Sequence, residues 1–170
     1  MRQKPRVAMK LPLHFFNHAS DLSRIEELRA ISLFKGLNPR ELREVDELLH
    51  ERTYQKDEII FDAGDVGLGL FIVVSGRVRA VSSRPDPEKL SAEFCCGDFF
   101  GEISLFDDSL RTSRVVAVEP SRVVALFRTE FFSLLERNHS IGTKILLELS
   151  KTVCHRLRRV LMGETPASCP

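Results

Sequence analysis

Between residues 53 and 127 the chain consists of short apolar runs separated by glycine, aspartate and proline. Residues 70–74 form one such run, which Ser75 and Gly76 close, and residues 77–81 then alternate polar and apolar side chains. Such alternation is typical of a half-exposed strand. Because no helical pattern separates the runs, they do not fit the alternating strands and helices of a parallel sheet. We therefore expect about eight short antiparallel strands in a sandwich or barrel.

Helical patterns flank this strand region on both sides. Before it, Asn38 is suited to cap a helix that begins at Pro39, and Glu41 stands three residues after the cap. After it, residues 130–137 form a short amphipathic segment, and a longer helix is expected from about 140 to 162. The apolar residues of that helix recur mostly four apart: Ile141, Ile145, Leu149, Val153, Leu157 and Leu161. The predicted fold class is mainly β with flanking helices.

The length of 170 residues favours a single domain. We divide the chain into a basic flexible arm at 1–18, one domain at 19–162 and a disordered tail at 163–170. The domain itself is divided into N-terminal helices at 19–50, a strand region at 53–127 and C-terminal helices at 128–162.

Charge and hydropathy argue against two classes of partner. The chain carries 25 Lys and Arg against 24 Asp and Glu, and this net charge of +1 leaves no basic excess for nucleic acid or an anionic membrane. No apolar run approaches the roughly 18 residues of a membrane span. The four cysteines fit no disulfide framework. We expect a soluble cytoplasmic protein with reduced cysteines and no membrane partner.

Residues 97–115 carry the pattern with the most chemical content. Gly101 allows the backbone to approach a ligand closely, and the N–H groups at the start of the following helical turn can bind an anion. Arg111 can add a positive fork for a phosphate, and Glu102 can accept hydrogen bonds from sugar hydroxyls. A phosphate, a ribose and one arginine together describe a nucleotide. Without a ligand, Glu102 and Arg111 are expected to form an ion pair.

One segment consists of Phe100-Gly101-Glu102-Ile103-Ser104-Leu105, five further residues and then Arg111-Thr112-Ser113. This segment resembles the phosphate-binding cassette of cyclic nucleotide-binding domains. This family includes regulatory subunits of cyclic-AMP-dependent kinase and bacterial catabolite activator proteins. The resemblance covers residues 33–160 and implies a double-stranded antiparallel β-helix, a β-roll of jelly-roll-like or cupin-like shape. It implies ligand-binding roles for Gly101, Glu102, Ile103, Ser104, Arg111, Thr112 and Ser113. In the family the closing helix covers the base, which makes Arg156 and Val160 candidates for a base-capping lid.

The chain departs from the family pattern at three positions around Arg111. Leu110 replaces the usual proline, Ser113 the usual alanine, and Arg114 the frequent threonine or serine. On a strand, Arg114 shares a face with Thr112, and it then contacts the ligand, points to solvent or blocks the base. Thr112 is compatible with both bases, so the choice between cyclic AMP and cyclic GMP stays open.

The resemblance implies a regulatory sensor that binds cyclic AMP or cyclic GMP and signals through movement of the C-terminal helix. Since only residues 163–170 follow that helix, we expect a stand-alone, bacterial-like member without a DNA-binding domain and without direct DNA binding. Its output then passes through an unknown protein effector or through self-association. The apolar stripe of the last helix predicts a homodimer.

Two other classes of function remain as alternatives. The departures at Leu110 and Arg114 motivate a degenerate domain that serves as a ligand-free interaction scaffold. An enzyme of the cupin type shares the β-roll shape, but it needs histidine ligands on strands, and no histidine lies within 51–138. No nucleophile motif is visible either, so we expect no catalytic residues, no metal and no cofactor.

Overall fold

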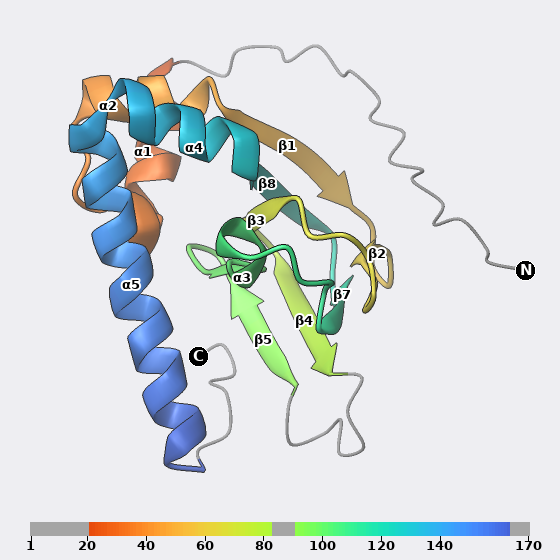
Figure 1. The fold of residues 1–170 in the computed structure, drawn as a ribbon. Helices are drawn as coiled ribbons and strands as arrows, with labels where there is room; N and C mark the ends of the chain where they lie inside the picture. Colours follow the sequence, from red (N-terminus) through yellow and green to blue (C-terminus); the bar gives the residue numbers. More distant parts are fainter. Residues whose placement is uncertain (1–20, 83–90, 164–170) are drawn as a thin grey trace, which may run out of the picture.

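The computed structural model describes residues 21–82 and 91–163, and its strands pair into two four-stranded antiparallel sheets (Figure 1). The first sheet has the order β1 (Leu49–Tyr54), β8 (Ser121–Phe127), β3 (Gly69–Ser75) and β6 (Phe99–Phe100). The second has the order β2 (Ile59–Phe61), β7 (Ser113–Ala117), β4 (Arg77–Ser82) and β5 (Ala92–Cys95). Strand β1 pairs with β8, and β2 pairs with β7. Both pairs join strands that are distant in sequence, as in a jelly roll. The predicted antiparallel β-roll with flanking helices is confirmed.

The strand β1 begins inside the segment for which the sequence predicts helix. The preceding helix, α2 (Pro39–Asp46), ends before it, and Leu49 is paired with Leu126 of β8. Leu49 continues the apolar spacing of α2, but six cross-strand pairs with β8 place it in the sheet. Strand β6 was also not predicted, because a strand of two residues is too short to show alternation.

The N-terminal helices are α1 (Asp21–Ala30), the 3₁₀ turn η1 (Ser32–Phe34) and α2. The predicted capping box of α2 is present. Asn38 Oδ1 accepts a hydrogen bond from the Glu41 backbone N–H at 3.1 Å, and Glu41 Oε2 accepts one from the Asn38 N–H at 2.8 Å. Both bonds satisfy groups that the helix itself leaves unpaired, which fixes the start of α2 at Pro39 as predicted.

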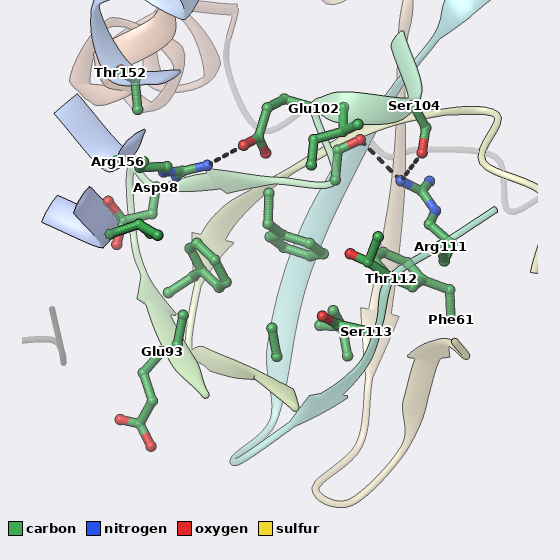
Figure 2. A pocket seen from close by; sticks show the side chains of 18 of the residues that line it. Phe61, Glu93, Asp98, Glu102, Ser104, Arg111, Thr112, Ser113, Thr152 and Arg156 are labelled. Carbon is green, nitrogen blue, oxygen red and sulfur yellow. Dashed lines mark hydrogen bonds and ion pairs between the residues drawn. The ribbon is translucent and has the colours of Figure 1, made fainter. Parts of the chain in front are cut away.

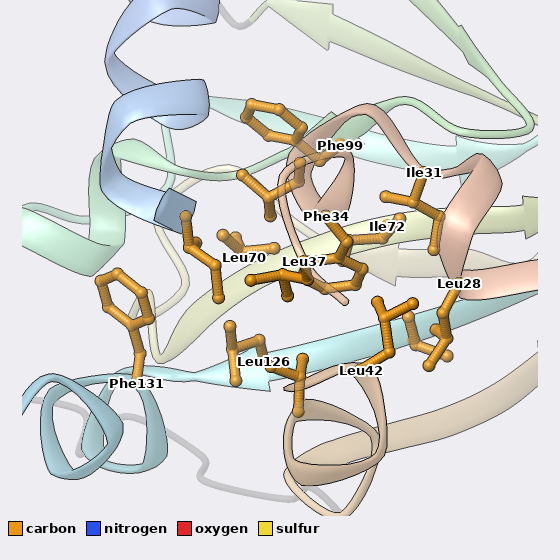
Figure 3. Packing of buried hydrophobic residues seen from close by; sticks show 14 of the residues in the cluster. Leu28, Ile31, Phe34, Leu37, Leu42, Leu70, Ile72, Phe99, Leu126 and Phe131 are labelled. Carbon is orange, nitrogen blue, oxygen red and sulfur yellow. The ribbon is translucent and has the colours of Figure 1, made fainter. Parts of the chain in front are cut away.

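Alternation along β3 divides the core into two clusters. Leu70, Ile72 and Val74 face the helices, whereas Phe71 and Val73 face the interior of the roll. The helices α1, η1, α2, α4 (Arg128–Arg137) and α5 (His139–Leu161) contribute to the first cluster. Figure 3 shows this cluster, which includes Leu28, Ile31, Phe34, Leu37, Leu42, Leu70, Ile72, Phe99, Leu126 and Phe131.

The long helix α5 has one buried half and one exposed half. Ile141, Ile145 and Leu149 lie in the core, while Val153 and Leu157 are exposed, as are the remaining apolar residues at its end, Val160 and Leu161. The predicted stripe is therefore core in its first part and surface in its second. Figure 1 shows α5 running along one side of the roll, past the N-terminal helices and toward the edge that carries β5.

Several predictions concern the chain outside the sheets. The arm at 1–18 and residues 164–170 of the tail lie outside the described residues. Within the described ranges, no helix is long and apolar enough to cross a membrane, and no three His, Cys, Asp or Glu side chains are placed to hold a metal ion. Cys96 and Cys154 are free thiols, whereas Cys95 is disulfide-bonded, so the prediction of reduced cysteines throughout is wrong at that position.

Candidate functional site

A cavity of about 570 Å³ lies between the β-roll and the second half of α5, and Figure 2 shows it from close by. This volume lies in the range of pockets that hold small molecules, about 300–1,000 Å³. Residues 100–113, called the cassette segment below, form one wall, and α5 supplies another. All nine residues singled out in the sequence line this cavity: Gly101, Glu102, Ile103, Ser104, Arg111, Thr112, Ser113, Arg156 and Val160.

Arg111 is a buried cation on the cassette side of the cavity. Its side chain is fixed by uncharged acceptors: Nη1 donates to Gly101 O at 2.9 Å and to Ser104 Oγ at 3.1 Å, and Nη2 donates to Gly69 O at 2.8 Å. The guanidinium carbon also lies 4.2 Å from the centre of the Phe61 ring, a cation–π contact. Among the described residues, no carboxylate lies within 4.0 Å of this guanidinium.

The electrostatics of Arg111 follow from this burial. Desolvation lowers the pKa of Arg111 from its usual value to about 10, although the negative charges of Asp65 and Glu102 act in the opposite direction. The group therefore stays positively charged at neutral pH. A fixed cation that is desolvated and only weakly compensated attracts an anion that enters the cavity.

Gly101 is required by the way the cassette segment approaches Arg111. Its φ of +73° lies in the left-handed region, and a Cβ placed there would be 2.6 Å from Arg111 Nη1. Gly67 is equally restricted, because its Cβ would lie 2.0 Å from Ser104 Oγ. The sequence assigns the Gly101 backbone to ligand approach; the structure shows that the same backbone also makes room for the arginine.

Glu102 is paired with Arg156 of α5, not with Arg111 as the sequence predicted. Arg156 Nη1 lies 2.9 Å from Glu102 Oε1, and Nη2 donates to Phe99 O at 2.5 Å. The Glu102 side chain is only 13% exposed. Arg111 instead turns toward the carbonyls of Gly101 and Gly69, which satisfy its donors without a carboxylate. The predicted ion pair between Glu102 and Arg111 is therefore wrong, and the lid candidate Arg156 is a direct neighbour of Glu102.

The departures from the family pattern leave the cavity open. Arg114 forms a bidentate ion pair with Asp62, in which Nε lies 2.8 Å from Oδ1 and Nη2 lies 2.9 Å from Oδ2. Arg114 does not line the cavity. Its hydrogen bond lowers the pKa of the exposed Asp62 carboxyl. Thr112 precedes β7, so the two residues do not share a strand face, and only Thr112 faces the cavity. Leu110 lines the cavity and forms an isolated β-bridge with Val66.

Several lining residues were missed in the sequence, among them one aromatic group and one group on α5. Phe61 and Phe94 of β2 and β5 form an aromatic floor with Phe100, with ring centres 5.3 to 5.9 Å apart; strand alternation alone does not show which face they occupy. The other group is Thr152, His155 and Arg159 of α5. Thr152 and Arg159 lie four and three positions from Arg156, so helical spacing places these two residues on its face, and they were detectable in the sequence.

Comparisons with known proteins agree with this geometry. The model of the cyclic nucleotide-binding domain family matches residues 51–138. The cyclic AMP receptor protein of Thermus thermophilus is 35% identical over 111 residues, which are 65% of this chain and 51% of that protein. The chain thus spans about half the length of this relative.

Solved structures share the same fold. The Thermus thermophilus catabolite activator protein matches with a TM-score of 0.69 and 32% identity, over 77% of this chain and 60% of that one. A cyclic nucleotide-binding domain from Methylobacillus flagellatus matches with a TM-score of 0.71 and 24% identity, over 88% of this chain and 86% of that one. Since the family model covers more than half of the chain and its fold is the one observed, this chain belongs to the cyclic nucleotide-binding domain family.

Proposed function

We propose that this chain binds cyclic AMP or cyclic GMP in the cavity between the cassette segment and α5. The observation that carries the proposal is the buried Arg111 guanidinium, which faces the cavity and is held by uncharged acceptors. A cyclic phosphate supplies the one negative charge that this cation lacks, and arginine forks match phosphate oxygens with two parallel hydrogen bonds. The relative named as a cyclic AMP receptor supports a ligand of this class.

The remaining roles follow from positions around the cavity. Arg111 and the backbone of residues 101–104 bind the phosphate, and Glu102 accepts from the ribose 2′-hydroxyl. Thr112 and Ser113 line the site beside the phosphate. The base lies toward the end of α5, near Val160 and Arg156, the residues we assign to the lid. The aromatic floor of Phe61, Phe94 and Phe100 provides the apolar surface that a purine covers.

In this proposal the domain at 19–162 is a cytoplasmic regulatory sensor. Its ligand shifts α5, and α5 transmits the signal to a protein effector or to a second copy of the chain. Such a shift requires that the ligand bind one arrangement of α5 more tightly than the other. The cavity supports this route because α5 itself forms one of its walls.

Cyclic nucleotide binding is expected to raise the melting temperature. At a ligand concentration about 100 times the dissociation constant, the stabilisation is about 2.7 kcal/mol, which for a chain of this size corresponds to about 5–11 °C. Differential scanning fluorimetry with cyclic AMP, cyclic GMP and the linear 5′-monophosphates measures it. The absence of a shift with either cyclic nucleotide at millimolar concentration would overturn the sensor proposal and favour the scaffold alternative.

We further propose a homodimer through the exposed part of α5. Val153, Leu157 and Leu161 lie one helical turn apart and are exposed, as the surface of a helix that pairs with another helix would be.

Leu157→Asp is expected to dissociate the dimer, because it places a charge between the two paired helices. Sedimentation velocity at tens of micromolar measures the change, with Leu147→Asp, an exposed leucine outside the stripe, as the matched control. A wild-type chain that sediments as a monomer would contradict the proposal.

A further inference from the structure

We propose that Arg128 is a positioning residue for Arg111: it fixes the two chain segments that hold the Arg111 guanidinium, and it thereby raises the affinity for the cyclic phosphate. The inference rests on the proposed function, since it names a further residue that determines how well the same site binds its ligand. Arg128 is the first residue of α4 and does not line the nucleotide cavity. It lines a separate, smaller cavity of about 350 Å³ together with Gly67, Leu68 and Asp108.

The contacts of Arg128 reach two segments that surround the nucleotide cavity. Its backbone N–H donates to Leu68 O, just before β3, at 2.8 Å. Its Nε donates to Leu105 O in the cassette segment at 3.0 Å, and its Nη2 donates to Asp107 O. Its Nη1 pairs with Asp108, whose side chain is 93% exposed. One residue of α4 is thus bonded both to the loop before β3 and to the cassette segment.

Each of these two segments carries an acceptor of Arg111. Leu68 precedes Gly69, whose carbonyl accepts from Arg111 Nη2 at 2.8 Å. Leu105 follows Ser104, whose hydroxyl accepts from Arg111 Nη1 at 3.1 Å, a contact that Figure 2 shows. Because adjacent residues are joined by one planar peptide bond, a displacement of Leu68 or Leu105 moves the acceptor beside it. Arg128 therefore fixes two of the groups that orient the Arg111 fork.

The cassette helix α3 (Ile103–Phe106) needs such external support, because it has only four residues. A single helical turn is unfavourable by itself, and a helix that ends at Phe106 offers no N–H group to the Leu105 carbonyl. Leu105 is fully buried, but Ile103 and Phe106 are 53% and 49% exposed, so packing holds only one side of α3. The hydrogen bonds from Arg128 hold its C-terminal end.

The position of Arg128 within α4 argues against a role in stabilising that helix. A positive charge in the first turn is unfavourable, because the N-terminus of a helix carries a partial positive charge. The ion pair with Asp108 offsets this little, since pairs with exposed partners contribute little. Hydrogen bonds from a charged donor to carbonyls are stronger than neutral ones. The two carbonyls of the cassette segment are therefore the contacts that favour arginine at this position.

The first test is calorimetric titration of wild type and Arg128→Ala with cyclic AMP and cyclic GMP. Arg128→Ala is expected to bind about 3- to 30-fold more weakly, a smaller loss than for Arg111→Ala because Arg128 does not touch the ligand. Arg137→Ala removes an exposed arginine of the same helix and is expected to bind as the wild type does. Asp108→Ala is also expected to match the wild type, because it leaves both carbonyl contacts in place.

The second test asks whether Arg128 acts through the fork of Arg111. Arg111→Lys keeps the charge but loses the fork that Gly69 and Ser104 orient. In this background Arg128→Ala is expected to weaken binding by less than about twofold. A variant that only lowered the stability of the whole fold would weaken binding by the same factor in both backgrounds.

A conservative variant extends both comparisons. Arg128→Lys keeps the charge but cannot donate to two carbonyls in the geometry of a fork, so its affinity is expected between those of the wild type and Arg128→Ala. Circular dichroism shows whether each variant is folded. If Arg128→Ala does not fold, Arg128→Lys takes its place in both comparisons, with the same direction of change.

The third test follows α3 without any ligand, by hydrogen exchange of residues 102–110. Arg128→Ala is expected to exchange faster than Arg137→Ala in this segment, because the C-terminal end of α3 has lost its hydrogen bonds. The residues of β8 are expected to exchange at the same rate in both variants, since the change is confined to the cassette segment.

The outcomes separate this inference from the proposed function. A wild type that binds, together with Arg128→Ala that binds within about twofold of it, overturns the positioning role and leaves the nucleotide site standing. Equal losses in the wild-type and Arg111→Lys backgrounds also overturn it, as does equal exchange of residues 102–110 in Arg128→Ala and Arg137→Ala. A wild type that binds neither cyclic nucleotide rejects the proposed function and this inference with it.

Discussion

Arg111→Ala is expected to weaken cyclic nucleotide binding by at least about 100-fold while the chain remains folded. Hydrogen bonds to a charged group contribute about 1.5–3 kcal/mol each, and an arginine fork makes two of them to a phosphate. Two such bonds correspond to a loss of two or more orders of magnitude in affinity, since about 1.4 kcal/mol is a factor of ten. Calorimetric titration with cyclic AMP and cyclic GMP measures the loss.

Two further variants test whether the loss of affinity is specific to the guanidinium of Arg111. Arg114→Ala removes an arginine only three residues away, which pairs with Asp62 at the surface, and it is expected to bind as the wild type does. Arg111→Lys keeps the charge but not the fork, so its affinity is expected between those of the wild type and Arg111→Ala. Circular dichroism confirms that each variant is folded. Binding by folded Arg111→Ala within about threefold of wild type would remove the phosphate role of this residue.

Gly69→Ala is expected to destabilise the fold. A Cβ at Gly69 would lie 2.3 Å from Leu126 O and 2.7 Å from Phe127 Cα, atoms of the paired strand β8 that cannot rotate away. Forcing additional atoms into a packed region costs about 1–3 kcal/mol, which lowers the melting temperature of a domain of this size by about 2–12 °C. Thermal unfolding followed by circular dichroism measures the effect.

Gly36→Ala is the matched control for this prediction. A Cβ at Gly36 would meet Lys144 Cβ at 3.8 Å, which is an ordinary contact, so its melting temperature is expected close to that of the wild type. Since the Gly69 carbonyl also accepts from Arg111, Gly69→Ala is further expected to weaken nucleotide binding. Equal melting temperatures for the two variants would show that β3 and β8 separate without cost.

The features that the sequence predicted correctly are those that short segments specify. The capping box between Asn38 and Glu41 joins residues three positions apart, so its geometry is the same wherever the helix lies. The strand at β3 follows from its own β-branched and aromatic side chains and from the closing turn at Gly76. The antiparallel β-roll followed from many such strands and from the family resemblance.

The features that the sequence missed or left open depended on partners far away in the sequence. The strand β1 forms because β8, more than seventy positions later, pairs with it, and this overrode the apolar spacing around Leu49. Arg114 turned out to pair with Asp62, although its strand position by itself left three directions open. In both cases the local pattern fits more than one outcome, and a contact between separate elements selects one.

The sequence by itself determined the composition of the site, because Gly101, Glu102 and Arg111 lie within one short segment whose spacing carries the family pattern. Only the tertiary structure decided how these charges are paired. Burial against the carbonyls of Gly101 and Gly69 fixed Arg111, while the packing of α5 brought Arg156 to Glu102 across more than fifty residues. Ion pairing depends on the distance between side chains in space, and that distance is set by how the helix packs against the roll.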